Sequence, residues 1–250
     1  MELIDVHAHL ESMRFDKDID DVISRARDVG VRVILNSGTG PKNNRKTLEI
    51  SEKYDIVKCS FGMYPVGNLS KDIDSEIDWI ENHKDICFAI GEIGLDYEGD
   101  EREKNSDRQK ELFRKMLNLA KKLDKPVVIH SRKAEEDVIK IMEAEGMKKV
   151  VMHCFSGKKS LIKRCVENGW FLSVPPVITR LQHFQTLVSI VPLGQMLTET
   201  DAPYLSPVAG ERNEPANVAV TIKEIAKIKG ISEEEVAEAI FNNAKRLFKI

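Results

Sequence analysis

Residues 1–10 of the chain read MELIDVHAHL and have the alternating pattern of a β-strand. Successive side chains of a strand point to opposite faces, so the even-numbered positions from 4 to 10 form one wholly apolar face. The odd-numbered positions form the other face, which carries Asp5, His7 and His9. The stretch therefore predicts a strand that ends in three ionisable groups on a single face.

Two imidazoles on one face of a strand indicate a metal site. A single histidine in a strand is most often a core or edge residue, and this alternative applies to His7 or His9 taken alone. Two neighbouring imidazoles without partners would cost about 2–7 kcal/mol for each unmet polar group. A metal ion offsets that cost, because neutral imidazole is the commonest metal ligand in proteins. The remaining ligands must come from elsewhere in the chain.

Short apolar stretches alternate with amphipathic helical stretches along all 250 residues. Strand followed by helix, repeated eight times over this length, predicts a (β/α)8 TIM barrel. A doubly wound open sheet has the same local pattern and is the alternative. We expect a single domain spanning residues 1–250, because no linker rich in Gly, Ser or Pro divides the chain. The expected strands are 3–10, 31–38, 56–65, 86–94, 126–132, 150–157, 170–176 and 195–203, and the expected helices are 18–29, 43–54, 72–83, 107–123, 134–145, 158–169, 179–190, 217–230 and 232–248.

Composition narrows the class of protein. The hydrophobic fraction is 42%, and no apolar run approaches the length that spans a membrane. The N-terminus lacks the pattern of a signal peptide, so we expect a cytoplasmic protein with no membrane partner and no obligate protein partner. The four cysteines lack C-x-x-C spacing, which argues against a disulfide framework. A net charge of −3 argues against a broad basic surface.

Ionisable residues recur at the ends of the expected strands. In a barrel these strand ends meet at one rim, so the side chains should converge. Four imidazoles and two carboxylates are too many for one tetrahedral ion and suit two divalent ions. The natural division gives three residues to one ion and two to the other, with Glu92 as the bridge. Asp5 and Glu199 are placed to orient the ligand side chains from the side away from the metal ions. The expected ligands are His7, His9 and Asp201 for one ion, His130 and His153 for the other, and Glu92 for both.

Several motifs resemble the TatD family of metal-dependent hydrolases, within the amidohydrolase superfamily. They are H-A-H at 7–9, G-E-I-G-L-D-Y at 91–97, I-H-S-R-K-A at 129–134, H-C-F-S-G at 153–157, E-T-D-A-P-Y-L at 199–205, R-N-E-P at 212–215 and N-N-A-K-R-L-F at 242–248. The resemblance implies a TIM barrel, up to two or three divalent metal ions, and deoxyribonuclease or phosphoesterase activity. It also implies ligand roles for the same six residues.

One position departs from the family pattern. Many members read G-x-H-P after the third strand, whereas this chain reads Gly62-Met63-Tyr64-Pro65. Tyrosine is a poor metal ligand at neutral pH, because its hydroxyl has a high pKa. We expect Tyr64, Arg132 and Arg212 to contact the substrate, since a phosphate needs donors and positive charges.

These residues favour a hydrolase in which a metal-activated water attacks a phosphorus or carbonyl centre. Asp201 is the expected proton acceptor, and with Glu92 it forms the expected catalytic pair. A DNA or nucleotide phosphodiester is the expected substrate. Alternatives are an ester or amide hydrolase, such as an aminoacyl-tRNA deacylase, and a non-catalytic binding barrel. The ligand types admit Zn, Mn, Co, Ni or Mg.

Overall fold

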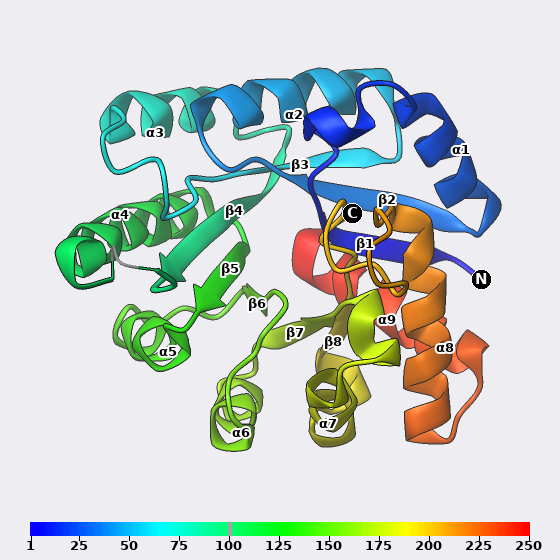
Figure 1. Ribbon diagram of the computed structural model, residues 1–250. Coiled ribbons are helices and arrows are strands. Elements are labelled where there is room, and N and C mark those ends of the chain that lie inside the picture. The colour runs from blue at the N-terminus through cyan, green and yellow to red at the C-terminus, as the bar shows by residue number, and fades with distance from the viewer. Residues whose placement is uncertain (100–101) are drawn as a thin grey trace.

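The computed structural model describes residues 1–99 and 102–250. Eight parallel strands form one sheet, in which neighbours in the chain are neighbours in the sheet. They lie at the centre of the molecule, and helices surround them (Figure 1). The strands are β1 (Leu3–Ala8), β2 (Val31–Ser37), β3 (Val57–Phe61), β4 (Cys87–Asp96), β5 (Val127–Arg132), β6 (Val150–Met152), β7 (Phe171–Val174) and β8 (Met196–Thr198).

The sheet curls until its last strand lies beside its first. Thr198 Oγ1 in β8 donates a hydrogen bond of 2.6 Å to the Ile4 carbonyl in β1. Just beyond β8, the Asp201 N–H donates to the His7 carbonyl over 2.8 Å. A doubly wound open sheet does not bring its first and last strands together in this way. The contacts therefore confirm the predicted (β/α)8 barrel and exclude the alternative.

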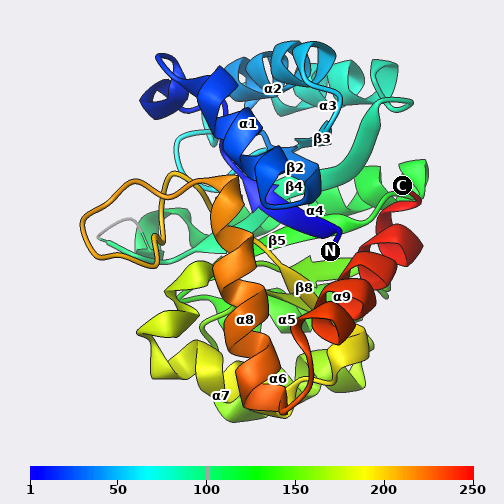
Figure 2. The ribbon, with the colours of Figure 1, turned by 90° about the vertical axis from the view of Figure 1, so that its right-hand side faces the viewer.

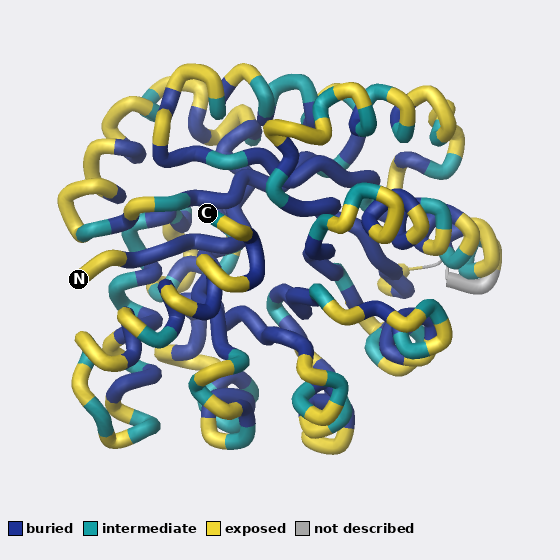
Figure 3. The backbone as a smooth tube through the Cα atoms, turned by 180° about the vertical axis from the view of Figure 1, so that it is seen from behind, coloured by how far each residue is buried: buried dark blue, intermediate teal, exposed yellow. Residues whose placement is uncertain are grey.

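The helices pack one face against the sheet and expose the other (Figures 2 and 3). In the first of them, Val22, Ile23 and Ala26 are buried at the three- to four-residue spacing of a helix face. All the predicted helices are present in the described part of the chain. Those helices are α1 (Ile19–Asp28), α2 (Pro41–Lys53), α3 (Ile73–Asn82), α4 (Arg102–Leu123), α5 (Glu135–Ala144), α6 (Lys159–Glu167), α7 (Gln182–Ile190), α8 (Val218–Lys229) and α9 (Glu233–Phe248), with 3-10 turns η1 (Met13–Phe15), η2 (Pro176–Thr179), η3 (Leu193–Gln195) and η4 (Pro215–Asn217).

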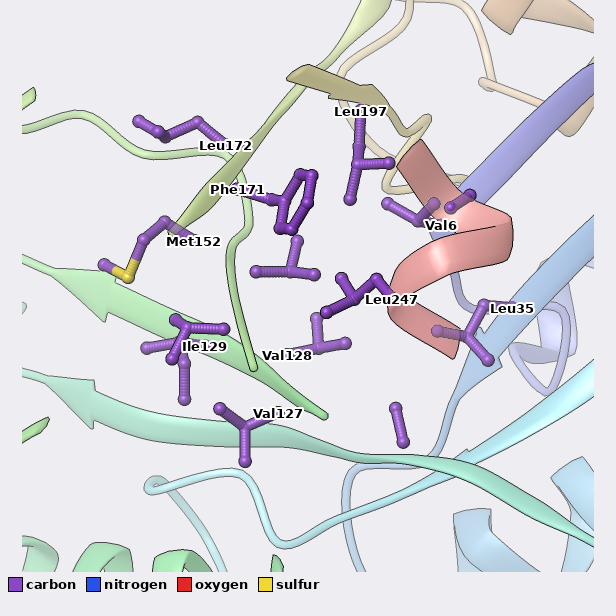
Figure 4. Close-up of a cluster of buried hydrophobic side chains, with 14 of the residues drawn as sticks. Val6, Leu35, Val127, Val128, Ile129, Met152, Phe171, Leu172, Leu197 and Leu247 are labelled. Atoms are coloured by element: carbon purple, nitrogen blue, oxygen red, sulfur yellow. The ribbon is translucent and has the colours of Figure 1, made fainter. Parts of the chain in front are cut away.

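Helix α9 closes the end of the barrel at which the strands begin. Leu247 of α9 lies in the central apolar cluster with Phe171 and Val128 (Figure 4). Asn243 Nδ2 donates to the Met196 carbonyl at the start of β8 over 2.9 Å, which fixes the helix to that strand. This end is therefore filled by side chains, which leaves the opposite end, where the strands finish, for a ligand.

The sequence has two long stretches without a strand or helix pattern, 95–106 and 202–216, which are therefore expected to lack regular structure. Segment 202–216 does so until η4 begins at Pro215, and it projects beyond the strand ends in Figure 2. Segment 95–106 is more ordered than expected, because β4 continues to Asp96 and α4 begins at Arg102. Residues 100–101 of that segment lie outside the described residues. No helix within residues 1–99 and 102–250 is long and apolar enough to cross a membrane.

Candidate metal centre

The strand ends bring together the six side chains that the sequence predicted as ligands. They come from strands or from the three residues that follow a strand, and five of them line a cavity of about 880 Å³. His7 is fully buried and lies 3.1 Å, Nε2 to Nε2, from His9. The five that line the cavity are His9, Glu92, His130, His153 and Asp201.

Glu92 lies between two groups of imidazoles, and its two oxygens face different groups. Oε1 is 2.9 Å from His130 Nδ1 and 3.0 Å from His153 Nε2. Oε2 is 3.4 Å from His9 Nε2 and 3.8 Å from His7 Nε2. A carboxylate placed in this way presents one oxygen to each of two neighbouring positions.

Asp201 completes the group around Oε2. Its Oδ1 is 3.5 Å from His7 Nε2 and 3.4 Å from His9 Nε2. The other oxygen, Oδ2, accepts no hydrogen bond from any residue that the structure describes, and Asp201 lines the cavity. One oxygen of Asp201 therefore faces the imidazoles, and the other remains free.

The separations between these atoms fit divalent metal ions. Ligand atoms lie about 2.0–2.2 Å from Zn²⁺, so two ligands of one ion are roughly 2.8–3.6 Å apart. The atoms of His7, His9 and Asp201 meet this condition, and so do those of Glu92, His130 and His153. Two groups, His7–His9–Asp201 and His7–Glu92–His153, have all their ligand atoms within 4.8 Å of one another. Imidazole and carboxylate are also the ligand types that Zn, Mn and related ions share.

Buried charge at this site requires positive partners. Burial opposes ionisation of Glu92, but the imidazoles around it hold the pKa of this carboxyl well below its usual range. Burial likewise opposes protonation of His153, yet Glu92 and Glu199 raise the pKa of this imidazole to about 10. The carboxylates are thus ionised, which is the form that binds metal, and they attract a cation to the site.

In each imidazole, the ring nitrogen that faces away from the other expected ligands lies close to a polar group. Such outer partners fix the orientation of metal-binding histidines. His153 Nδ1 is 3.5 Å from Glu199 Oε2, which makes the two an ion pair without a hydrogen bond. The other pairs are His7 Nδ1 with Ser37 Oγ at 3.0 Å, His9 Nδ1 with the Ser37 carbonyl at 2.9 Å and Glu11 at 3.1 Å, and His130 Nε2 with Asp96 at 3.1 Å.

The structure gives different results for the two residues expected to orient ligands. Glu199 lies beside an imidazole as expected, and its oxygens also accept from Ser173 Oγ and from the Cys154 N–H. Among the described residues, Asp5 makes no hydrogen bond or ion pair with an imidazole nitrogen. It accepts from Thr200 Oγ1 over 2.5 Å and from the Thr200 N–H over 2.9 Å. Its Oδ1 also accepts from the His7 N–H over 3.2 Å. Asp5 therefore holds the backbone of the expected ligand His7 and of the chain just before Asp201, and not an imidazole.

The three residues expected to contact substrate differ in position. Tyr64 and Arg132 line the cavity. The Tyr64 hydroxyl donates to Asp96 Oδ2 over 2.5 Å, and Arg132 pairs with the partly exposed Glu98. Arg212 does not line the cavity. The expectation for Arg212 is corrected because its guanidinium pairs with Asp18, donates to the Arg14 carbonyl and lies 4.7 Å from the Phe15 ring centroid.

Comparison with known proteins identifies the family. The model of the family described as TatD related DNase matches residues 4–249. The chain belongs to the TatD family. Human "Deoxyribonuclease TATDN3" is 36% identical over 263 residues, which cover 98% of this chain and 94% of the human protein. The "Uncharacterized metal-dependent hydrolase YabD" of Bacillus subtilis is 36% identical over 257 residues, covering 99% of each chain. The crystal structure of YJJV, a TatD homolog from Escherichia coli, has a TM-score of 0.91 at 30% identity and covers 99% of this chain and 98% of its own.

Sequence reasoning missed several residues at the centre of this TatD-family protein. Asp96 and Glu11 contact metal-site imidazoles, and neither was singled out. The spacing contained a signal for both. Asp96 lies four positions after Glu92 in the same strand, so it is on the same face, and Glu11 lies two positions after His9. Ser37, at the end of β2, carried no such signal.

Proposed function

We propose that this TatD-family protein is a deoxyribonuclease that hydrolyses phosphodiester bonds with two divalent metal ions. The observation that carries the proposal is Glu92, whose two oxygens face two separate groups of imidazoles. The printed name of the human relative supports the substrate class, and the name of the Bacillus subtilis relative supports the metal dependence.

The division of ligands follows the oxygens of Glu92. His7, His9 and Asp201 would hold one ion with Oε2, and His130 and His153 would hold the other with Oε1. Ions bound there would supply Lewis acidity for the substrate oxygen and would lower the pKa of a water molecule. The ligand set suits Zn, Mn, Co or Ni, and the carboxylates also admit Mg.

Asp201 is the proposed proton acceptor. Its Oδ1 faces His7 and His9, and Asp201 lines the cavity, so Oδ2, which accepts no hydrogen bond from the described residues, would take a proton from the attacking water. Imidazoles hold the pKa of Asp201 below its usual range although burial opposes this, so the carboxylate is ionised and able to accept. It can return that proton to the leaving oxygen later in the reaction.

Tyr64 and Arg132 are the proposed substrate contacts. Asp96 holds the Tyr64 hydroxyl at the cavity wall, 3.3 Å from His130 Nε2, so the phenol is fixed before substrate binds. Arg132 is more than half exposed, and its pairing with Glu98 leaves other guanidinium N–H groups available to a phosphate. Such exposed ion pairs exchange partners at little cost.

A panel of substrates tests the proposal. The metal-loaded protein is incubated with single-stranded DNA, a chromogenic phosphodiester, a carboxyl ester and an aminoacyl-tRNA. We expect metal-dependent hydrolysis of the two phosphodiesters, abolished by a chelator and restored by added metal. Faster cleavage of the carboxyl ester or the aminoacyl-tRNA would contradict the proposed substrate class, and no cleavage of any member would contradict hydrolysis.

A further inference from the structure

A second, smaller cavity of about 350 Å³ adjoins the metal cavity on the side of β2 and β3. The two cavities adjoin at four residues that line both, which are Thr39, Lys42, Asn43 and Tyr64. A chain-like ligand whose reacting group lies at the metal centre would therefore pass along these four residues to reach the second cavity.

The second cavity is positively charged. Lys42 and Lys71 belong to its lining, and its described lining contains no carboxylate. Neither ammonium group has a hydrogen-bonding or ion-pair partner among residues 1–99 and 102–250. Nearby cations differ in this respect, since Arg45 pairs with the buried Glu76 and Lys46 pairs with Asp16 at 2.7 Å. The charges of Lys42 and Lys71 thus remain available to a ligand.

The backbone adds donors of the same kind. Helix α2 begins in this cavity, with Gly40 as an N-cap that offers no side-chain acceptor. The N–H groups of Lys42 and Asn43 in its first turn have no acceptor among the described residues, and the first turn carries no acidic side chain. The free N–H groups and positive end of a helix favour an anion. The lysine side chains and the N–H groups of the helix therefore both favour an anionic ligand.

The surrounding amides hold this wall in place. Asn68 Nδ2 donates to the Thr39 carbonyl over 2.7 Å and to the Tyr64 carbonyl over 2.8 Å. Asn43 Nδ2 donates to Thr39 Oγ1 over 2.6 Å. These bonds join the loops that follow β2 and β3, so the cationic wall has a fixed position relative to Tyr64 and the metal centre.

We propose that the second cavity is a subsite for the phosphate next to the scissile one in the same nucleic-acid strand. The inference rests on the proposed phosphodiesterase function and adds a substrate preference to it. A strand that fills both cavities gains the contacts of Lys42, Lys71 and the α2 N-terminus. Substrates with a second phosphodiester should therefore be preferred over substrates with only one.

Binding and hydrolysis of two short substrates test this subsite. The substrates are a thymidine dinucleotide with one phosphodiester and a thymidine trinucleotide with two, both without terminal phosphates. Affinities are measured in Asp201→Asn protein with and without Lys71→Ala, and kcat/KM is measured in otherwise wild-type protein. Lys223→Ala serves as the control, because Lys223 is an exposed lysine of α8 outside both cavities.

We expect Lys71→Ala to lower the ratio of trinucleotide to dinucleotide affinity about fivefold, the upper range for one exposed ion pair. The slope of log affinity against log salt for the trinucleotide should fall by about 0.7, as for the loss of one phosphate contact on a single strand. The kcat/KM ratio should fall in parallel, and Lys223→Ala should change none of these quantities.

Two results separate the subsite from the function. An unchanged affinity ratio in Lys71→Ala and in the Lys42→Ala, Lys71→Ala double variant would overturn the subsite, whatever the activity. Absence of hydrolysis of both substrates by metal-loaded wild-type protein would instead contradict the proposed function. An equal fall in both affinities leaves the ratio unchanged and is therefore the first of these results, because Lys71 would then not act through the second phosphate.

Discussion

Replacing Glu92 by glutamine should weaken binding of both metal ions. The carboxylate presents Oε1 to His130 and His153 and Oε2 to His7 and His9. An amide keeps one oxygen and presents an NH2 group, which is not a metal ligand, to the other imidazole pair. One ion therefore loses a ligand, and both ions lose the negative charge between them.

The expected magnitude follows from this shared position. Loss of a residue that hydrogen-bonds a metal ligand lowers metal affinity about 10–100-fold. Loss of a carboxylate that binds the metal directly should lower metal affinity by at least the upper value. This is about 100-fold for each ion, or roughly 2.8 kcal/mol. His153→Asn provides the comparison, because His153 lies on the Oε1 side and should affect mainly one ion.

Competition with a chromogenic chelator, followed by elemental analysis after dialysis, measures both affinities. Glu238→Gln is the control, because it removes the same charge from an exposed position of α9. Circular dichroism must show that Glu92→Gln is folded. If folded Glu92→Gln binds both ions as tightly as the control, or loses only one and keeps the other at full affinity, Glu92 does not bridge two ions.

Three other variants test neighbouring parts of the account. Asp201→Asn should retain much of its metal in excess Mn or Zn but lose about 10²–10⁴ in phosphodiesterase rate; recovery of the wild-type rate at full occupancy would show that Asp201 accepts no proton. Glu199→Gln should weaken binding of the ion beside His153 about 10- to 100-fold, because Glu199 is buried beside His153 Nδ1. Unchanged metal affinity in a folded variant would show that Glu199 has a purely structural role. Leu247→Ala should lower the free energy of unfolding by about 2–5 kcal/mol, against less than about 1 kcal/mol for the more exposed Leu181→Ala; equal losses in denaturant titrations would show that α9 does not close the barrel as described.

The barrel could be predicted from the sequence because its elements are locally encoded. Each strand is a short apolar run, and each helix has an amphipathic period that a barrel buries on one side. The start of α4 was not predicted, because residues 102–106 read REKNS and contain no apolar side chain to reveal a helix face. A periodicity argument cannot detect a solvent-exposed first turn.

The gathering of the six side chains was predictable for a related reason. In a barrel, a residue at the end of any strand lies near the same rim, so position along the strand predicts proximity. The partners of those side chains were less predictable, since they depend on loops. Arg212 pairs with Asp18, 194 positions away, and nothing in the local sequence predicts that contact. The roles of Asp5 and Glu199 likewise depend on how the residues after β8 meet β1, β7 and the residues after β6.

The most direct test of the account is the position of the metal ions themselves. Crystals grown with Mn²⁺ or Zn²⁺ give an anomalous difference map in which metal positions appear independently of any model. The account predicts two peaks, one beside His7, His9 and Asp201 and one beside His130 and His153, with Glu92 between them. A map without a peak at these residues, or with a single peak that Glu92 does not share with a second, would contradict the two-ion centre.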